Sequence, residues 1–161
     1  MLNAIRYGVL FALAIFLWAV AETALGLHGR YIRYHEYLSY FFAVPSVGIM
    51  YWGMCAGQQN RPGGMGFRSA FRKGLGITVV VSLLCPVVWY VFCVYVNPDF
   101  LGNMARHAVE TKQMAPPLAA KRFSLSGHLL VSALSTAVVG AVISLVIAVI
   151  VARRKGIKQI S

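Results

Sequence analysis

The stretch LLVSALSTAVVGAVISLVIAVIVA, from Leu129 to Ala152, decides the fold class because it carries no charged side chain. A bilayer core about 30 Å thick needs about 20 mostly apolar residues in a helix that rises about 1.5 Å per residue. Three other stretches meet this requirement, at residues 7–27, 37–56 and 75–96. A β-barrel would need short alternating strands, which these runs lack. The sequence predicts an all-α integral membrane protein, with residues 1–161 forming one domain of four transmembrane helices.

The composition of the whole chain supports this prediction. Of the 161 residues, 59% are hydrophobic and 12% are charged, whereas a soluble domain has about 25% charged residues. This composition excludes both a soluble globular domain and a disordered chain. The three cysteines are an odd number and lie in apolar runs, so no disulfide framework is expected.

The net charge of +11 comes from basic residues that lie between the apolar runs. Such a placement points to membrane lipids as partners and not to nucleic acid, and no nucleic acid partner is predicted. Because the Lys and Arg bias of short loops sets orientation, both termini and the middle loop are predicted to be cytoplasmic. The side with more basic residues has Arg6, Arg61, Arg68, Arg72, Lys73, Arg153, Arg154, Lys155 and Lys158, and the other has Arg30, Arg33, Arg106, Lys112, Lys121 and Arg122.

The first apolar run has an alternative interpretation. A basic Arg6, an apolar stretch and then Ala19-Val20-Ala21 also resemble a secretory signal with its cleavage site. The apolar character that resumes after Glu22 favours a retained span.

Two loops contain amphipathic segments that predict short helices at the membrane surface. Near residues 67–73, Phe67 and Phe71 share one helical face and basic residues occupy the other. Near residues 98–112, Asn97-Pro98-Asp99 is typical of a helix start, and the pair Pro116-Pro117 is expected to end the helix.

Features inside the spans concern packing. Pro45 and Pro86 lie near the middle of the second and third spans and are predicted to kink them. The fourth span has small residues at every fourth position, a pattern that allows close helix contact, either within the chain or with a second copy or another membrane protein. These residues are Ser132, Thr136, Gly140, Ser144 and Ala148.

The residues that could bind a ligand or a proton lie on the predicted outer side of the membrane. Glu22 is the one ionisable residue inside a predicted span, and intramembrane carboxylates often serve as proton, ion or ligand groups. It could also pair with Arg30 or Arg33 or extend to the headgroups. Glu36 falls on the same side, as do all four histidines, namely His28, His35, His107 and His128. No local spacing of metal ligands is present, so no metal and no cofactor is predicted, and the histidines are candidates only if folding gathers them.

Four segments of the chain are similar to those of a known protein family. They are WAVAETALGLHG (18–29), YHEY (34–37), GGMGFRSAFRKG (63–74) and YVNPDF (95–100). With them the chain resembles a family of small four-span bacterial membrane proteins known only as domain of unknown function 4199. The resemblance implies four helices and an inner-membrane location, and it brings no activity and no catalytic residue. Residues 113–121 match it less well.

The sequence alone leaves three functional hypotheses. The first is a non-enzymatic scaffold or accessory subunit that packs through the fourth span. The second is a small transporter coupled to protons or metal ions, using Glu22, His28, His35 and His128. The third is a membrane enzyme with its site in the outer polar layer, although no catalytic motif is present.

Overall fold

The computed structural model describes residues 2–56 and 65–157. All of its regular elements in these ranges are helical, which confirms the all-α prediction. The helices are α1 (Leu2–Ala24), η1 (Ile32–Tyr34), α2 (His35–Ser39), η2 (Tyr40–Phe42), α3 (Ala43–Cys55), α4 (Phe67–Val91), the π-helical η3 (Phe92–Val96), α5 (Phe100–Glu110), α6 (Pro116–Arg122) and α7 (Leu125–Ile157).

Four helical stretches in the described residues are long and apolar enough to cross a membrane, as predicted. They cover Leu2–Ala24, Ile32–Cys55, Phe67–Val96 and Leu125–Arg153. All four begin several residues before the predicted apolar runs, because a helix continues through the polar interface as long as no residue breaks it. The second span is composite: 3-10 turns flank α2 before α3 begins.

The surface segments differ in part from the prediction. Residues 67–73 form no separate interfacial helix; they are the first two turns of α4, which continues without a break through Gly74. The helix expected near residues 98–112 is present as α5. Pro116 and Pro117 begin α6 instead of only ending a helix, because a first helical turn does not need their missing N–H groups.

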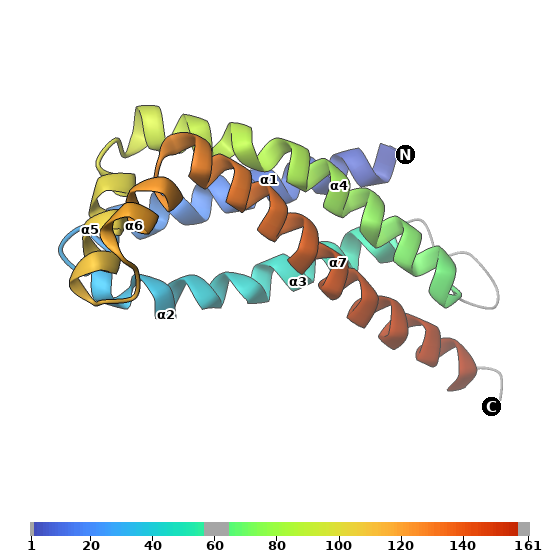
Figure 1. The fold of residues 1–161 in the computed structure, drawn as a ribbon. Helices are drawn as coiled ribbons and strands as arrows, with labels where there is room; N and C mark the ends of the chain where they lie inside the picture. Colours follow the sequence, from blue (N-terminus) through green and yellow to red (C-terminus); the bar gives the residue numbers. More distant parts are fainter. Residues whose placement is uncertain (1, 57–64, 158–161) are drawn as a thin grey trace.

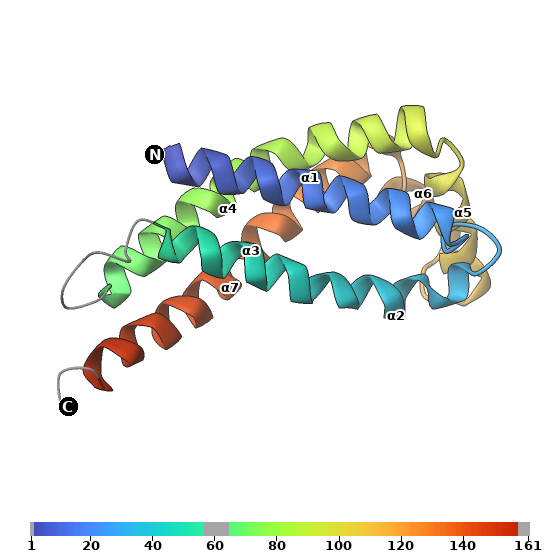
Figure 2. The same ribbon diagram turned by 180° about the vertical axis from the view of Figure 1, so that it is seen from behind.

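The spans are arranged in two layers, with α1 and α3 in one and α4 and α7 in the other (Figures 1 and 2). Both termini lie at one end of the bundle, which we call the terminal end. Helices α2, α5 and α6 lie at the opposite end, which we call the α5 end (Figure 1). One buried cluster includes Met50, Met54, Ile77 and Ala148 of three spans, and a second, around Phe92, lies towards α5.

The small residues of α7 lie against α4 of the same chain. A Cβ atom added at Gly140 would lie 2.7 Å from Cγ2 of Thr78, and one added at Gly74 would lie 2.6 Å from Cβ of Ser144. Ser144 is fully buried and its hydroxyl is 3.4 Å from that of Thr78. Close approach of the two backbones therefore holds α4 and α7 together. This is expected in a membrane, because the hydrophobic effect does not bring helices together in lipid and close packing must do so.

The two intramembrane prolines have different surroundings. Pro45 is the third residue of α3, and α3 directly follows the 3-10 turn Tyr40–Phe42. Pro86 lies inside α4, which the structure keeps as one helix from Phe67 to Val91. The kinks at both prolines stay predictions.

Candidate metal centre

Glu22 lies in the last turn of α1, at the α5 end of the bundle, and is only 5% exposed. Its Oε1 atom accepts two hydrogen bonds, from the indole N–H of Trp18 at 2.8 Å and from the hydroxyl of Ser39 at 2.6 Å. These donors come from α1 itself and from α2. The carboxylate is therefore fixed by one oxygen, and the other oxygen, Oε2, faces two histidines.

A tight turn after α1 brings His28 back to Glu22. Gly26 has a φ of 74°, in the left-handed region that favours glycine, and its carbonyl accepts a hydrogen bond from Tyr31 N at 2.9 Å. As a result, Nε2 of His28 lies 3.2 Å from Oε2 of Glu22. His28 is 2% exposed, so this contact is shielded from water.

His35 approaches the same oxygen from the start of α2. Its Nδ1 atom lies 3.6 Å from Oε2 of Glu22 and 3.3 Å from the hydroxyl of Ser39. The rings of His28 and His35 meet edge to face with their centroids 4.8 Å apart. The three possible ligand atoms of Glu22, His28 and His35 all lie within 4.8 Å of one another, and no other group of three such residues occurs in the described ranges.

Two of the three separations in this group are close to those of a tetrahedral metal site. With ligand bonds of about 2.0–2.1 Å, nitrogen and oxygen ligands on a tetrahedron are about 3.3–3.4 Å apart. The two distances from Oε2 of Glu22, 3.2 Å and 3.6 Å, lie on either side of that value. One carboxylate and two imidazoles are also a ligand set that zinc enzymes use, with the fourth position left open.

Both ring nitrogens of His28 have polar partners. The Thr23 hydroxyl has one hydrogen, which it donates to the carbonyl of Ala19 at 3.0 Å. Nδ1 of His28 lies 2.8 Å from Thr23 Oγ1 and 3.5 Å from the amide nitrogen of Asn97. A neutral imidazole carries its hydrogen on one of its two nitrogens. With the hydrogen on Nε2, His28 donates a hydrogen bond to Glu22 at 3.2 Å. With the hydrogen on Nδ1, Nε2 presents a lone pair that a metal ion can bind.

Residues that follow α4 hold this arrangement in place. The amide of Asn103 donates to the His28 carbonyl at 2.9 Å, and the amide of Asn97 lies 3.5 Å from Thr23 Oγ1. The rings of Phe100 and Phe92 lie 4.7 Å and 5.5 Å from the His28 ring. Aromatic walls exclude water from one side of the site, which strengthens electrostatic interactions inside it.

The remaining sequence candidates are not part of this group. Glu36 is exposed and His107 is half-buried on α5. His128 is 7% exposed and packs edge to face on Trp89 at 4.7 Å. Arg122 has only donors, so its contact of 3.5 Å with Nδ1 of His128 places the imidazole hydrogen on Nε2. That Nε2 is buried and has no hydrogen-bond partner.

Sequence reasoning missed the residues that surround the three ligands. Trp18 is four residues before Glu22, so helical spacing could have found it, whereas Thr23, the next residue along, falls on a different face of the helix. Asn97 was recognised only as part of a helix start. Ser39 gave no signal, because it is 17 residues from Glu22 and follows a turn whose course the sequence does not fix.

A shallow apolar cavity of about 350 Å³ leads to Glu22 from the side of the bundle. The cavity lies between the end of α1 and the second span. The lining residues are Trp18, Ala21, Glu22, Leu25, Leu27, Leu38 and Phe41.

Together, the four spans and the buried Glu22 define a polytopic membrane protein with a polar site near one surface. The chain belongs to the family described as "Protein of unknown function (DUF4199)", whose model matches residues 6–153. This confirms the resemblance drawn from the sequence. Comparison with curated proteins and with solved structures gave no match.

Proposed function

We propose that this protein is a membrane-embedded metal-binding protein that holds one divalent transition metal, with zinc as the model ion, on Glu22, His28 and His35. The observation that carries the proposal is the pair of distances from Glu22 Oε2, 3.2 Å to His28 and 3.6 Å to His35. Zinc prefers such nitrogen and oxygen ligands in tetrahedral geometry.

The hydrogen bonds around the ligands support the proposal. Metal-bound histidines commonly donate their second N–H to a fixed acceptor, and bound carboxylates are themselves hydrogen-bonded. Here the Thr23 hydroxyl lies 2.8 Å from Nδ1 of His28, while Trp18 and Ser39 hold the oxygen of Glu22 that faces away from the histidines. The ligands are therefore oriented before any ion arrives.

The charge distribution favours binding over conduction. All four acids of the chain, Glu22, Glu36, Asp99 and Glu110, lie at the α5 end or in its loops. A cation that left the site towards the terminal end would meet no carboxylate inside the bilayer, where an unpaired charge is expensive. We therefore favour a metal carrier or sensor over the proton- or metal-coupled transporter.

We further infer that the protein lies in a bacterial inner membrane with its termini in the cytoplasm. The bias of Lys and Arg towards the terminal end supports this orientation. The metal site would then face the outer surface, where it could exchange ions with the surroundings.

The scaffold hypothesis remains a second proposal, but the surface that would contact a partner differs from the one predicted from the sequence. The small-residue face of α7 is already occupied by α4. A partner would therefore use the opposite face of α7, which presents large apolar side chains such as Leu134, Val138 and Val142, each more than half exposed.

The test is a zinc titration of the purified protein in detergent, followed by calorimetry and by elemental analysis of the washed protein. We expect one bound zinc per chain, and a loss of affinity greater than about 100-fold for His28→Ala and for His35→Ala. Thr23→Val, which alters only the orientation of His28, should cost about 10–100-fold.

His107→Ala and Glu36→Gln are the matched controls, since both lie at the α5 end but outside the group, and they should bind zinc like the wild type. Thermal unfolding of each variant checks that it is folded. If the wild type retains no zinc, or if the controls lose as much affinity as the ligand variants, the proposal is wrong.

A further inference from the structure

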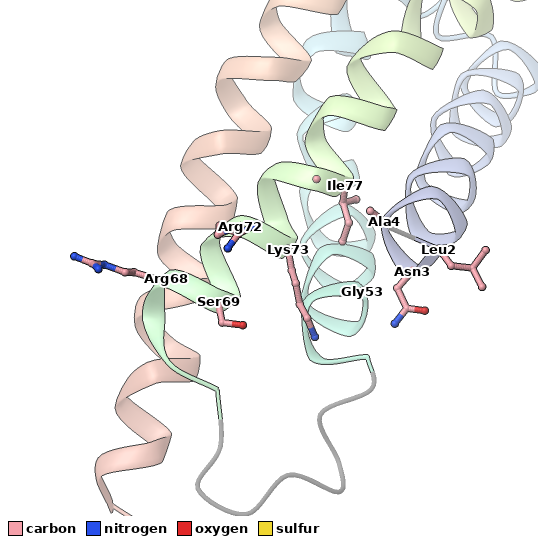
Figure 3. A pocket seen from close by; sticks show the side chains of 10 residues that line it. Leu2, Asn3, Ala4, Gly53, Arg68, Ser69, Arg72, Lys73 and Ile77 are labelled. Atoms are coloured by element: carbon pink, nitrogen blue, oxygen red, sulfur yellow. The ribbon is translucent and has the colours of Figure 1, made fainter.

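A cavity at the terminal end of the bundle is separate from the candidate metal centre. It has a volume of about 760 Å³, within the range of about 300–1,000 Å³ typical of ligand sites. It lies where the start of α1, the end of α3 and the start of α4 meet (Figure 3). The polar side chains that line it are Asn3, Arg68, Ser69, Arg72 and Lys73.

Three of these side chains are cationic, and one of them is fixed. Nζ of Lys73 donates to the carbonyl of Ala56 at 3.0 Å and contacts that of Met54 at 3.4 Å, so it neutralises the C-terminal end of α3. Figure 3 shows Lys73 extending from α4 towards the end of α3, whereas Arg68 extends from the start of α4 to the side away from Lys73 and Asn3. Arg68 and Arg72 are exposed.

No acidic side chain is near enough to balance Arg68 and Arg72. The chain has only four Asp and Glu residues, at positions 22, 36, 99 and 110, and all of them belong to the α5 end. The positive charge of the cavity must therefore be balanced by anions from its surroundings. In a membrane, the anions present at this depth at high concentration are lipid phosphates.

We propose that this cavity binds the headgroup of an anionic phospholipid. Arg68 and Arg72 carry guanidinium groups that can bind a phosphate through two hydrogen bonds each, and the hydroxyl of Ser69 and the amide of Asn3 can contact the glycerol. Leu2, 81% exposed at the cavity edge, offers an apolar contact for the acyl chain. Basic pockets between transmembrane helices bind such headgroups in other proteins.

The experiment uses the full chain in nanodiscs of phosphatidylcholine with increasing phosphatidylglycerol, and counts retained lipids by native mass spectrometry. We expect the wild type to retain phosphatidylglycerol in preference to phosphatidylcholine. The double variant Arg68→Gln/Arg72→Gln should lose this preference by roughly 30-fold, since each basic group near a membrane surface contributes a several-fold gain. Ser69→Phe, which fills the cavity without changing its charge, should also lose it.

The matched control is Arg6→Gln/Arg153→Gln, which removes two exposed charges from the same end outside the cavity lining. This control should keep the wild-type preference. An equal loss in the control would show diffuse attraction and overturn the proposal, as would a wild type without preference. Equal binding of soluble glycerol phosphate would overturn the assignment to a lipid.

Discussion

Oε2 of Glu22 lies 3.2 Å from Nε2 of His28, and the two side chains are only 6% and 2% exposed. The other imidazole nitrogen of His28 lies 2.8 Å from the Thr23 hydroxyl, so both ring nitrogens have polar partners. The same pair therefore affects both the stability of the α5 end and its affinity for ions.

Replacing Glu22 with alanine should destabilise the protein by about 3–5 kcal/mol, the typical cost of breaking a buried charge pair. The change leaves the Trp18 indole, the Ser39 hydroxyl and His28 without their common acceptor. Denaturant unfolding in detergent micelles measures the loss. The exposed Glu36→Ala should change stability by less than about 0.5 kcal/mol. Equal effects of the two variants would contradict a central role for Glu22.

Zinc affinity should fall as the pH is lowered from 7.5 to 5.5. A metal and a proton compete for the same lone pairs on Nε2 of His28 and Nδ1 of His35, so binding releases protons. Each histidine that must give up a proton on binding adds to this loss. Zinc titrations at several pH values measure the slope. His107→Ala should follow the wild-type curve, and an affinity independent of pH would argue against histidine ligands.

Gly140→Leu should destabilise the packing of α7 on α4 by about 1–3 kcal/mol, the usual cost of overpacking. Any side chain at this position meets Thr78, because an added Cβ would lie 2.7 Å from its Cγ2 atom. Val138→Leu, at a position 64% exposed on the same helix, serves as the control and should be close to neutral. Thermal unfolding compares the two. Unchanged stability of Gly140→Leu would mean that α4 and α7 pack less closely than described.

The orientation can be tested by labelling single cysteines in intact cells. In a chain whose native cysteines are replaced by serine or alanine, Glu110→Cys on α5 should react with a membrane-impermeant maleimide from outside. Ser69→Cys on the first turn of α4 should react only after the cells are opened. Both positions are exposed, so access depends on the side of the membrane. The reverse pattern would place the metal site in the cytoplasm.

The four spans could be predicted because their signal is local. An uncharged run such as Leu129–Ala152 is stable in a bilayer only as a helix, and no distant contact is needed to recognise it. The ends of the helices were harder to predict. Residues 67–73 looked like a surface helix because of their amphipathic pattern, yet they continue into α4, where Gly74 allows Ser144 to come close.

The candidate site was only partly visible in the sequence. Glu22, His28 and His35 were all named as candidates, but no spacing rule linked them, because the turn at Gly26 and the start of α2 bring them together. The order of spans and loops predicted that His107 and His128 lie on the same side as Glu22, but in the structure neither of them belongs to the Glu22 group. Ser39 and Asn103 were missed, since each acts across a tertiary contact that the sequence does not encode locally.

The absence of acids from the terminal end also has a consequence for the whole molecule. In the proposed orientation, the excess of positive charge lies on the side where a respiring cell is electrically negative. The membrane potential acts on such charges with about 2.3 kcal/mol per unit charge for each 100 mV. The voltage across the membrane would therefore itself oppose translocation of the basic end and help to keep the bundle in a single topology.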